Sequence, residues 1–203
     1  MRVEQIKSHG DNFAYLAWDE EGLQGIVIDP GFNSEEVISV ARREGVRARL
    51  IIATHHHADH SAGLAAVKKA LGGEVAVHSL SPLVADRHLA DGETMRVGGL
   101  EVRIIHTPGH TADGISILID GAVFTGDTLF VGECGRTDLP GGDSRALYGS
   151  LFGKLLGLGE GTRLYPGHDY GKKPYSTIGE ERRTNYTLRD RSLEEFVAFM
   201  NEP

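Results

Sequence analysis

The 203-residue sequence predicts a single α/β domain, on the basis of three observations. Residues 25–28, 34–45 and 50–53 carry strand, helix and strand patterns in succession, which is a β-α-β unit. Short strand patterns elsewhere are joined by glycine-containing turns that are typical of hairpins. Four apolar strands also run into turns that are followed by histidine or aspartate. These patterns predict sheets whose strand ends gather a polar site.

Composition limits the kinds of function that the protein can have. Hydrophobic residues make up 40% and charged residues 25%, as in ordinary globular proteins. The net charge of -8 argues against nucleic acid as a partner, because phosphate binding needs a concentrated positive field. Neither a signal-like segment nor an apolar run of membrane-spanning length is present. A single cysteine, Cys134, fits a reducing compartment, so we expect a cytoplasmic protein without a membrane partner.

The first half of the chain, 1–98, begins with a three-stranded antiparallel meander. Strand patterns at 3–7, 13–18 and 25–28 are separated by turn residues. Ser34 followed by Glu36 predicts an N-capped helix that ends near Gly45. A helix is expected at 61–71, a strand at 74–78 and a hairpin of 93–97 with 100–106, while 81–88 fits no single pattern.

The second half, 99–203, repeats this plan. Residues 115–119 and 122–125 flank Asp120 and Gly121, which predicts another hairpin. Residues 145–158 carry helix-spaced apolar side chains, 162–165 reads as a last strand, and two helical pieces follow.

The ten residues 54–63, T-H-H-H-A-D-H-S-A-G, place four imidazoles and a carboxylate in one loop after a buried strand. Alternation points His55 and His57 the same way and His56 outward. Asp59 and His60 turn inward from the first turn of the next helix. These side chains are donors that zinc and iron accept, so one or two cations are expected here.

Three more candidate ligands follow apolar strands later in the chain. They are His110, Asp127 and His168, each placed after a turn that contains glycine. Sheets collect such strand ends on one edge, where open α/β sheets bind their ligands. We therefore expect residues more than a hundred positions apart to meet in one site.

This ordered pattern resembles the metallo-β-lactamase superfamily along nearly the whole chain. The resemblance implies an αββα sandwich, in which two mixed β-sheets are flanked by helices, with the metal site at one end. It assigns His55, His57 and His110 to a first metal and Asp59, His60 and His168 to a second, with Asp127 bridging them.

Within that superfamily, the motifs 126–130, 135–139 and 166–170 are similar to the branch that contains glyoxalase II and the persulfide dioxygenases. Arg136 and Tyr170 match positions that contact the glutathione part of the substrate, although Asp138 replaces an expected aromatic residue. The chain also ends about twenty residues after Asn185, without the helical glutathione-binding domain of glyoxalase II. The sequence therefore does not determine which thiol compound forms the carrier part of the substrate.

The sequence favours a hydrolase of small acyl-thioesters, with a hydroxide shared by two metals as nucleophile. Asp59 and His60 are its expected catalytic residues, because they bind the second metal and Asp59 can orient the water. Zinc is the expected metal, with iron and manganese as alternatives. The rival function is persulfide oxidation by one ferrous ion on His55, His110 and Asp127. A non-catalytic metal-binding or nucleic-acid-processing protein is a third, less favoured class.

Overall fold

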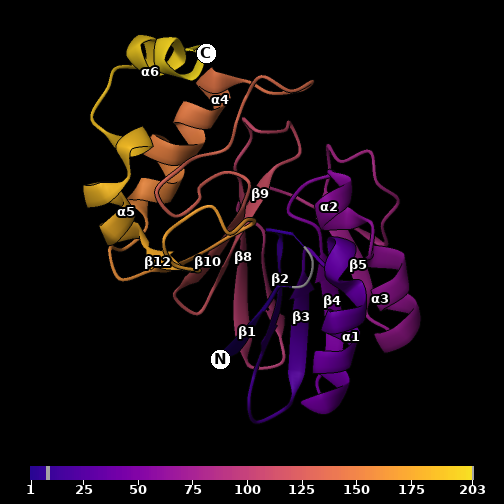
Figure 1. Ribbon diagram of the computed structural model, residues 1–203. Helices are drawn as coiled ribbons and strands as arrows, with labels where there is room; N and C mark the ends of the chain where they lie inside the picture. Colours follow the sequence, from indigo (N-terminus) through magenta and orange to yellow (C-terminus); the bar gives the residue numbers. More distant parts are fainter. Residues whose placement is uncertain (8–9, 203) are drawn as a thin grey trace.

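The computed structural model describes residues 1–7 and 10–202. Two six-stranded sheets pack face to face, and helices cover both outer faces (Figure 1). This arrangement confirms the predicted αββα sandwich.

The first sheet has the strand order β1-β2-β3-β4-β5-β6. Its first three strands are antiparallel, as the predicted meander requires, and the pairs from β3 to β6 are parallel. The parallel pairing of β3 with β4 across a helix confirms the β-α-β unit. The bounds are Arg2–Lys7 (β1), Phe13–Trp18 (β2), Gln24–Ile28 (β3), Arg47–Ile52 (β4), Glu74–His78 (β5) and Arg87–Leu89 (β6).

The second sheet has the order β12-β11-β10-β9-β8-β7, with only β10 and β11 parallel. The chain changes sheets between Leu89 and Thr94, before the expected boundary at 98 and 99, because β7 and β8 form a hairpin within one sheet. The bounds are Thr94–Val97 (β7), Leu100–His106 (β8), Ile115–Ile119 (β9), Ala122–Gly126 (β10), Arg163–Pro166 (β11) and Ser176–Thr177 (β12).

Three α-helices lie on the outer face of the first sheet: α1 (Ser34–Arg43), α2 (Ala58–Ser61) and α3 (Leu64–Leu71). The helix expected at 61–71 is confirmed over 64–71 as α3, but its start is wrong, because the chain breaks between α2 and α3. There the 3-10 turn η1 (Gly31–Asn33) packs so tightly that a Cβ on Gly63 would lie 2.5 Å from the Gly31 carbonyl oxygen. The predicted Ser34 cap is also wrong: Asn33 is the N-cap and its side chain makes no capping hydrogen bond, because η1 leads directly into α1.

The second sheet is covered by the later helices. The predicted helix at 145–158 is helical but irregular, because Gly149, Gly153 and Gly157 recur every fourth residue and weaken a regular α-helix. The bounds are Ser144–Tyr148 (α4), Gly149–Lys154 (η2, a π-helix), Leu155–Gly157 (η3), Ile178–Thr184 (α5), Tyr186–Leu188 (η4) and Leu193–Met200 (α6).

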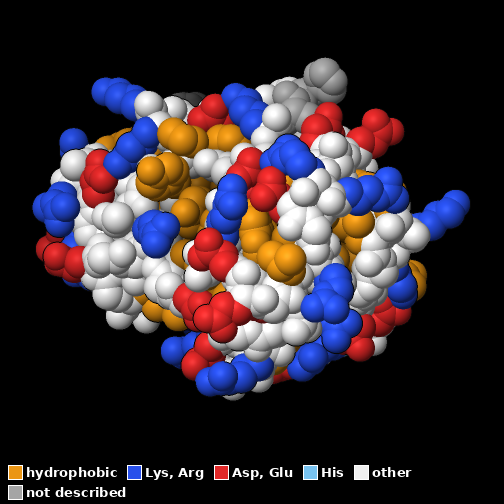
Figure 2. Space-filling view, turned by 90° about the horizontal axis from the view of Figure 1, so that it is seen from below, with side chains coloured by type: hydrophobic (Ala, Val, Ile, Leu, Met, Phe, Trp, Pro, Cys, Tyr) orange, Lys and Arg blue, Asp and Glu red, His pale blue; other side chains and the backbone are white. Residues whose placement is uncertain are grey.

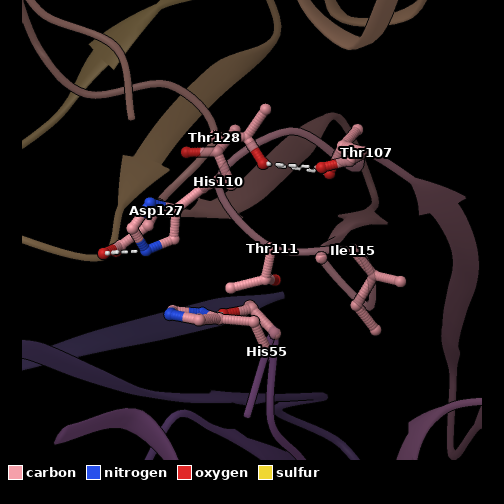
Figure 3. Close-up of a pocket in the computed structure, with 10 residues that line it drawn as sticks. His55, Thr107, His110, Thr111, Ile115, Asp127 and Thr128 are labelled. Atoms are coloured by element: carbon pink, nitrogen blue, oxygen red, sulfur yellow. Dashed lines mark hydrogen bonds and ion pairs between the residues drawn. The ribbon is translucent and has the colours of Figure 1, made fainter. Parts of the chain in front are cut away.

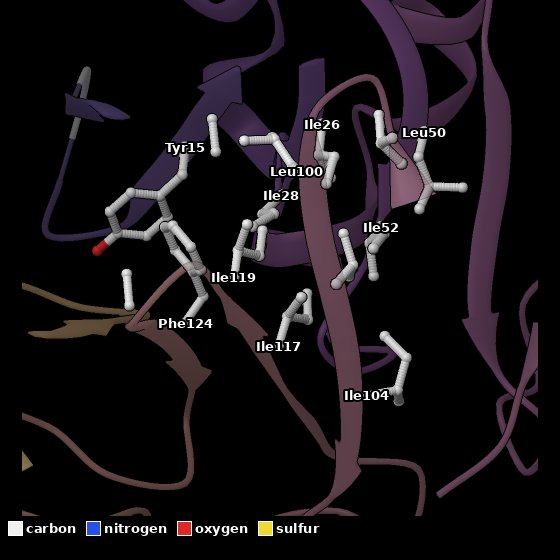
Figure 4. Close-up of a cluster of buried hydrophobic side chains, with 14 of the residues drawn as sticks. Tyr15, Ile26, Ile28, Leu50, Ile52, Leu100, Ile104, Ile117, Ile119 and Phe124 are labelled. Atoms are coloured by element: carbon white, nitrogen blue, oxygen red, sulfur yellow. The ribbon is translucent and has the colours of Figure 1, made fainter. Parts of the chain in front are cut away.

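The main core lies between the sheets and is built from aliphatic and aromatic side chains of both (Figure 4). The Tyr15 and Phe124 rings, one from each sheet, meet edge to face at 5.1 Å. Each such buried side chain contributes about 1.5–3 kcal/mol, so the core fixes the two sheets against each other. Their strand ends are thereby held at one rigid edge.

The surface viewed in Figure 2 mixes acidic and basic side chains, with hydrophobic side chains between them. Among the described helices, none combines the length and the apolar character needed to cross a bilayer.

Candidate metal centre

Seven polar side chains from separate loops meet at one end of the sandwich. His55 and His57 follow β4, Asp59 and His60 belong to α2, and the others follow β8, β10 and β11. Figure 3 shows His55, His110 and Asp127 approaching one another from three parts of the chain. The predicted ligand residues therefore converge as expected: His55, His57, Asp59, His60, His110, Asp127 and His168.

Three histidine nitrogens form the first donor group. The Nδ1 atom of His57 lies 3.0 Å from Nε2 of His55 and 3.0 Å from Nε2 of His110. An Asp127 oxygen lies 3.5 Å from Nε2 of His110. Ligand atoms about 2.0–2.1 Å from a tetrahedral zinc ion are roughly 3.3 Å apart, so this spacing suits a single cation.

The second donor group has the same spacing. Nε2 of His60 and Nε2 of His168 are 3.2 Å apart, and an Asp59 oxygen lies 3.4 and 3.5 Å from them. Asp127 turns one oxygen to each of these histidines, at 3.3 Å in both cases. Asp127 is therefore the carboxylate common to both groups.

Hydrogen bonds on the far side of each ring determine which nitrogen faces the centre. His110 donates from Nδ1 to the Arg136 carbonyl at 2.8 Å, and His60 donates from Nδ1 to Asp29 at 3.0 Å. Their Nε2 atoms then present lone pairs to carboxylate oxygens. One of those oxygens, Oδ1 of Asp127, is buried and accepts no hydrogen bond from the described residues. Converging lone pairs repel one another unless a cation lies between them, so the donor set fits divalent metal.

The acid–base properties of these groups agree with a strong mutual interaction. Burial alone would raise the pKa of Asp127, but the neighbouring His60 and His168 hold it well below its usual range. Burial alone would lower the pKa of His60, but the Asp127 and Asp29 carboxylates raise it well above the usual value. In the absence of metal, a proton on His60 therefore compensates the buried carboxylates, and a metal ion competes for the same Nε2 atom.

Asp29, at the end of β3, supports the centre and was not predicted as a site residue. It is buried and accepts hydrogen bonds from the Thr54 amide at 2.7 Å, the Thr54 hydroxyl at 2.7 Å and His60. It thus fixes both the start of the ligand loop and the ring of His60. The signal was present in the sequence, because Asp29 directly follows an apolar strand, although its glycine-containing turn (Pro30-Gly31) comes after it and not before it as at Asp127.

A cavity of about 190 Å³ opens beside His110 and Asp127. Arg136 and Tyr170 line it, as predicted for substrate-contacting residues, together with Phe130, Glu133 and Cys134. The Tyr170 ring stacks on the metal-site residue His168, at 4.9 Å and 6°. The exposed Arg136 guanidinium pairs with Asp138 at 2.6 Å. Both residues therefore lie where they can contact a substrate, and their role in binding stays a prediction.

The fold and the donor groups define a metal-dependent enzyme of the metallo-beta-lactamase superfamily. The model of that superfamily matches residues 10–84 and 79–168, and the chain belongs to it. The resemblance seen in the sequence is therefore confirmed.

The chain is similar to proteins that carry different functional names. Human "Persulfide dioxygenase ETHE1, mitochondrial" is 35% identical over 93% of this chain and 75% of its own length. A "Hydroxyacylglutathione hydrolase" of Anaeromyxobacter dehalogenans is 38% identical over 79% of this chain and 62% of its own length.

Solved structures agree with this relationship. The crystal structure of ETHE1 from Myxococcus xanthus has a TM-score of 0.93 and 34% identity, and the alignment covers 100% of this chain and 92% of that one. The structure of TTHA1623 in a di-iron-bound form has a TM-score of 0.76 and 32% identity, covering 93% of this chain and 100% of that one. Divalent metal binding is thus supported by the donor groups and by relatives.

Proposed function

We propose that the protein is a persulfide dioxygenase that uses one ferrous ion held by His55, His110 and Asp127. The observation that carries the proposal is the 35% identity to human persulfide dioxygenase ETHE1 over 93% of the chain, together with the ETHE1 structure that covers all of it. Thioester hydrolysis, the function that the sequence favoured, becomes the second candidate.

The donor chemistry supports this choice. Two imidazoles and one carboxylate on one face are the ligand set of non-haem ferrous oxygenases, and they leave positions open for substrates. A ferrous ion held there supplies the redox chemistry with dioxygen. In this arrangement His60 and His168 position the Asp127 carboxylate, since the Nε2 atom of each histidine lies 3.3 Å from a different Asp127 oxygen.

The cavity residues then bind the persulfide. Phe130 and Tyr170 form an apolar wall that excludes water from the reacting sulfur, and Arg136 at the rim meets the anionic part of the thiol carrier. Burial raises the pKa of Cys134 to about 12. Cys134 therefore stays a protonated thiol and belongs to the wall of the cavity rather than acting as a nucleophile.

The second candidate is hydrolysis of small acyl-thioesters with two divalent metals. It is favoured by the complete second donor group of Asp59, His60, His168 and Asp127, whose atoms lie 3.2–3.5 Å apart. It is also favoured by the relative named hydroxyacylglutathione hydrolase. In that reaction Asp59 and His60 hold the second metal, zinc or manganese, and Asp59 orients the attacking water.

Under both proposals the partner is a small thiol-derived molecule, with no nucleic acid or membrane involved, and the cytoplasm is the proposed compartment.

One experiment separates the two reactions. Protein loaded with iron, zinc or manganese is incubated with glutathione persulfide or with S-lactoylglutathione, following oxygen consumption and thiol release. We expect oxygen uptake with the persulfide, in the iron form alone. Cleavage of the thioester without oxygen uptake would refute the dioxygenase proposal.

The Asp59→Ala variant gives an independent answer. A mononuclear dioxygenase keeps most of its iron-dependent oxygen uptake, because Asp59 does not bind the ferrous ion. A dinuclear hydrolase loses at least about 10²-fold in kcat, since its second metal is lost. A comparable loss of oxygen uptake would count against the mononuclear iron site.

A further inference from the structure

We propose that His56 and Asp113 form a positioning pair that holds the two main ligand loops in register and thereby places His57 for metal binding. The inference rests on metal binding by the first donor group of His55, His57 and His110, which is the ligand set of the second candidate function, the hydrolysis of acyl-thioesters with two metals. Neither His56 nor Asp113 is part of either donor group.

The pair joins loops that are far apart in the sequence. Nδ1 of His56 lies 2.8 Å from a carboxylate oxygen of Asp113. His56 stands between two ligand residues of the first loop, and Asp113 stands three residues after the ligand His110 in the loop between β8 and β9. A contact between them therefore links the two supports of the first donor group directly.

Two further hydrogen bonds restrict how these loops can move relative to each other. The Ile115 amide donates to the Thr54 carbonyl at 2.8 Å, which joins the same two loops at the start of the ligand segment. The Ser61 hydroxyl also donates to the His56 carbonyl at 3.1 Å, so the backbone of His56 is fixed as well as its ring. With the chain held at Thr54 and at His56, the segment between them has little freedom to rotate.

His57 is the ligand that gains most from this support. His55 and His110 are buried, whereas His57 is half-exposed and less constrained by packing. Its Nδ1 atom must nevertheless stay 3.0 Å from the nitrogens of both other histidines. Metal binding tolerates only small displacements of a ligand, so loss of the adjacent anchor is expected to weaken binding.

The burial of the Asp113 carboxylate, which is energetically unfavourable by itself, is consistent with a positioning role. Only 3% of its side chain is exposed. Burial of a carboxylate is unfavourable unless it is hydrogen-bonded, and the His56 ring supplies a hydrogen bond at 2.8 Å. The 34% exposure of the His56 side chain shows that His56 itself is not a core packing residue.

The test measures zinc affinity of the full chain by competition with a chromophoric chelator, alongside the unfolding free energy of the metal-free protein. Asp113→Ala and His56→Ala should each weaken zinc binding by about 10- to 100-fold. The double variant should lose no more than either single one, because both changes break one interaction. Asp113→Asn keeps an acceptor oxygen and should stay within about threefold of wild type.

His88→Ala, a change at an exposed histidine on β6, is the matched control and should bind zinc normally. The absorption spectrum of the cobalt-loaded protein gives a second readout. If His57 is displaced, the ligand-field bands of the cobalt ion should weaken and shift in wavelength. A change in unfolding free energy with unchanged zinc affinity and an unchanged cobalt spectrum would overturn the proposal, and so would additive losses in the double variant. If Asp113→Ala does not fold, His56→Ala decides by the same criteria.

Asp127→Ala separates this inference from the function on which it rests. If Asp127→Ala keeps its zinc, the proposed metal centre itself is wrong. If Asp127→Ala loses zinc while His56→Ala and Asp113→Ala do not, only the positioning pair is wrong.

Discussion

Replacing Asp29 by asparagine tests whether one buried carboxylate orients the ring of His60. Asp29 has a positive φ of 49°, which asparagine adopts as readily as aspartate, so the backbone is not strained by the change. Asparagine keeps one acceptor oxygen for the Thr54 amide. Its amide nitrogen, however, faces two groups that currently donate to Asp29, the Thr54 hydroxyl and Nδ1 of His60.

The magnitude follows from these contacts. A hydrogen bond to a charged group contributes about 1.5–3 kcal/mol, so disruption of two of them should cost roughly 2–4 kcal/mol of unfolding free energy after partial rearrangement. His60 also loses the partner that keeps its proton on Nδ1 and its lone pair on Nε2. Loss of such a partner typically weakens metal affinity by about 10- to 100-fold.

Two measurements check this expectation: chelator competition for zinc affinity, and denaturant unfolding of the metal-free protein. Asp120→Asn is the matched control, because Asp120 also has a positive φ, of 43°, but is exposed and far from the metal centre in the β9–β10 turn. Zinc affinity of Asp29→Asn within twofold of wild type would refute the reasoning, whatever its stability.

Gly167→Ala should lower zinc affinity at least about tenfold, because its Cβ would lie 2.3 Å from an Asp127 oxygen; Gly161→Ala, with open space around it, is the control in the same titration. Zinc binding should release protons, measured by calorimetry in buffers of different ionisation enthalpy, because the pKa of His60 is raised in the metal-free protein. In the metal-free protein, the contribution of His60 to stability is fully present below about pH 6.5 and is lost as pH rises through the folded pKa of His60. The pKa of Asp127 is lowered, so its contribution is present above about pH 4 and is lost as pH falls through the folded pKa of Asp127. The zinc-induced rise in Tm should therefore grow from about pH 6 to about pH 8, and a constant or decreasing rise would contradict this linkage.

The sequence determined most of the secondary structure and the candidate metal-site residues that the fold brings together. Alternating and continuous apolar patterns located the meander, the β-α-β unit and both predicted hairpins, because burial on one or two faces of a strand is recorded directly in residue order. Histidine and aspartate placed after four of those strands indicated the convergent site for the same reason: strand ends share an edge.

The local pattern failed where packing between distant segments competes with it. The helix expected at 61–71 is interrupted because η1, some thirty residues earlier in the chain, packs against Gly63. The two- and three-residue strands β12 and β6 carry too few residues to show a period.

The tertiary structure alone decided how the centre is held. Asp29 lies 31 positions from His60, and Asp113 lies 57 positions from His56, yet each pair is in hydrogen-bond contact. Such contacts depend on the path of whole loops between strand ends and leave no periodic signal in the residues themselves. The sequence by itself therefore determined which side chains meet at the metal centre, whereas the fold decided which nitrogen of each ring faces inward and how firmly it is held, because ring orientation is set by partners that only the packed sheets bring together.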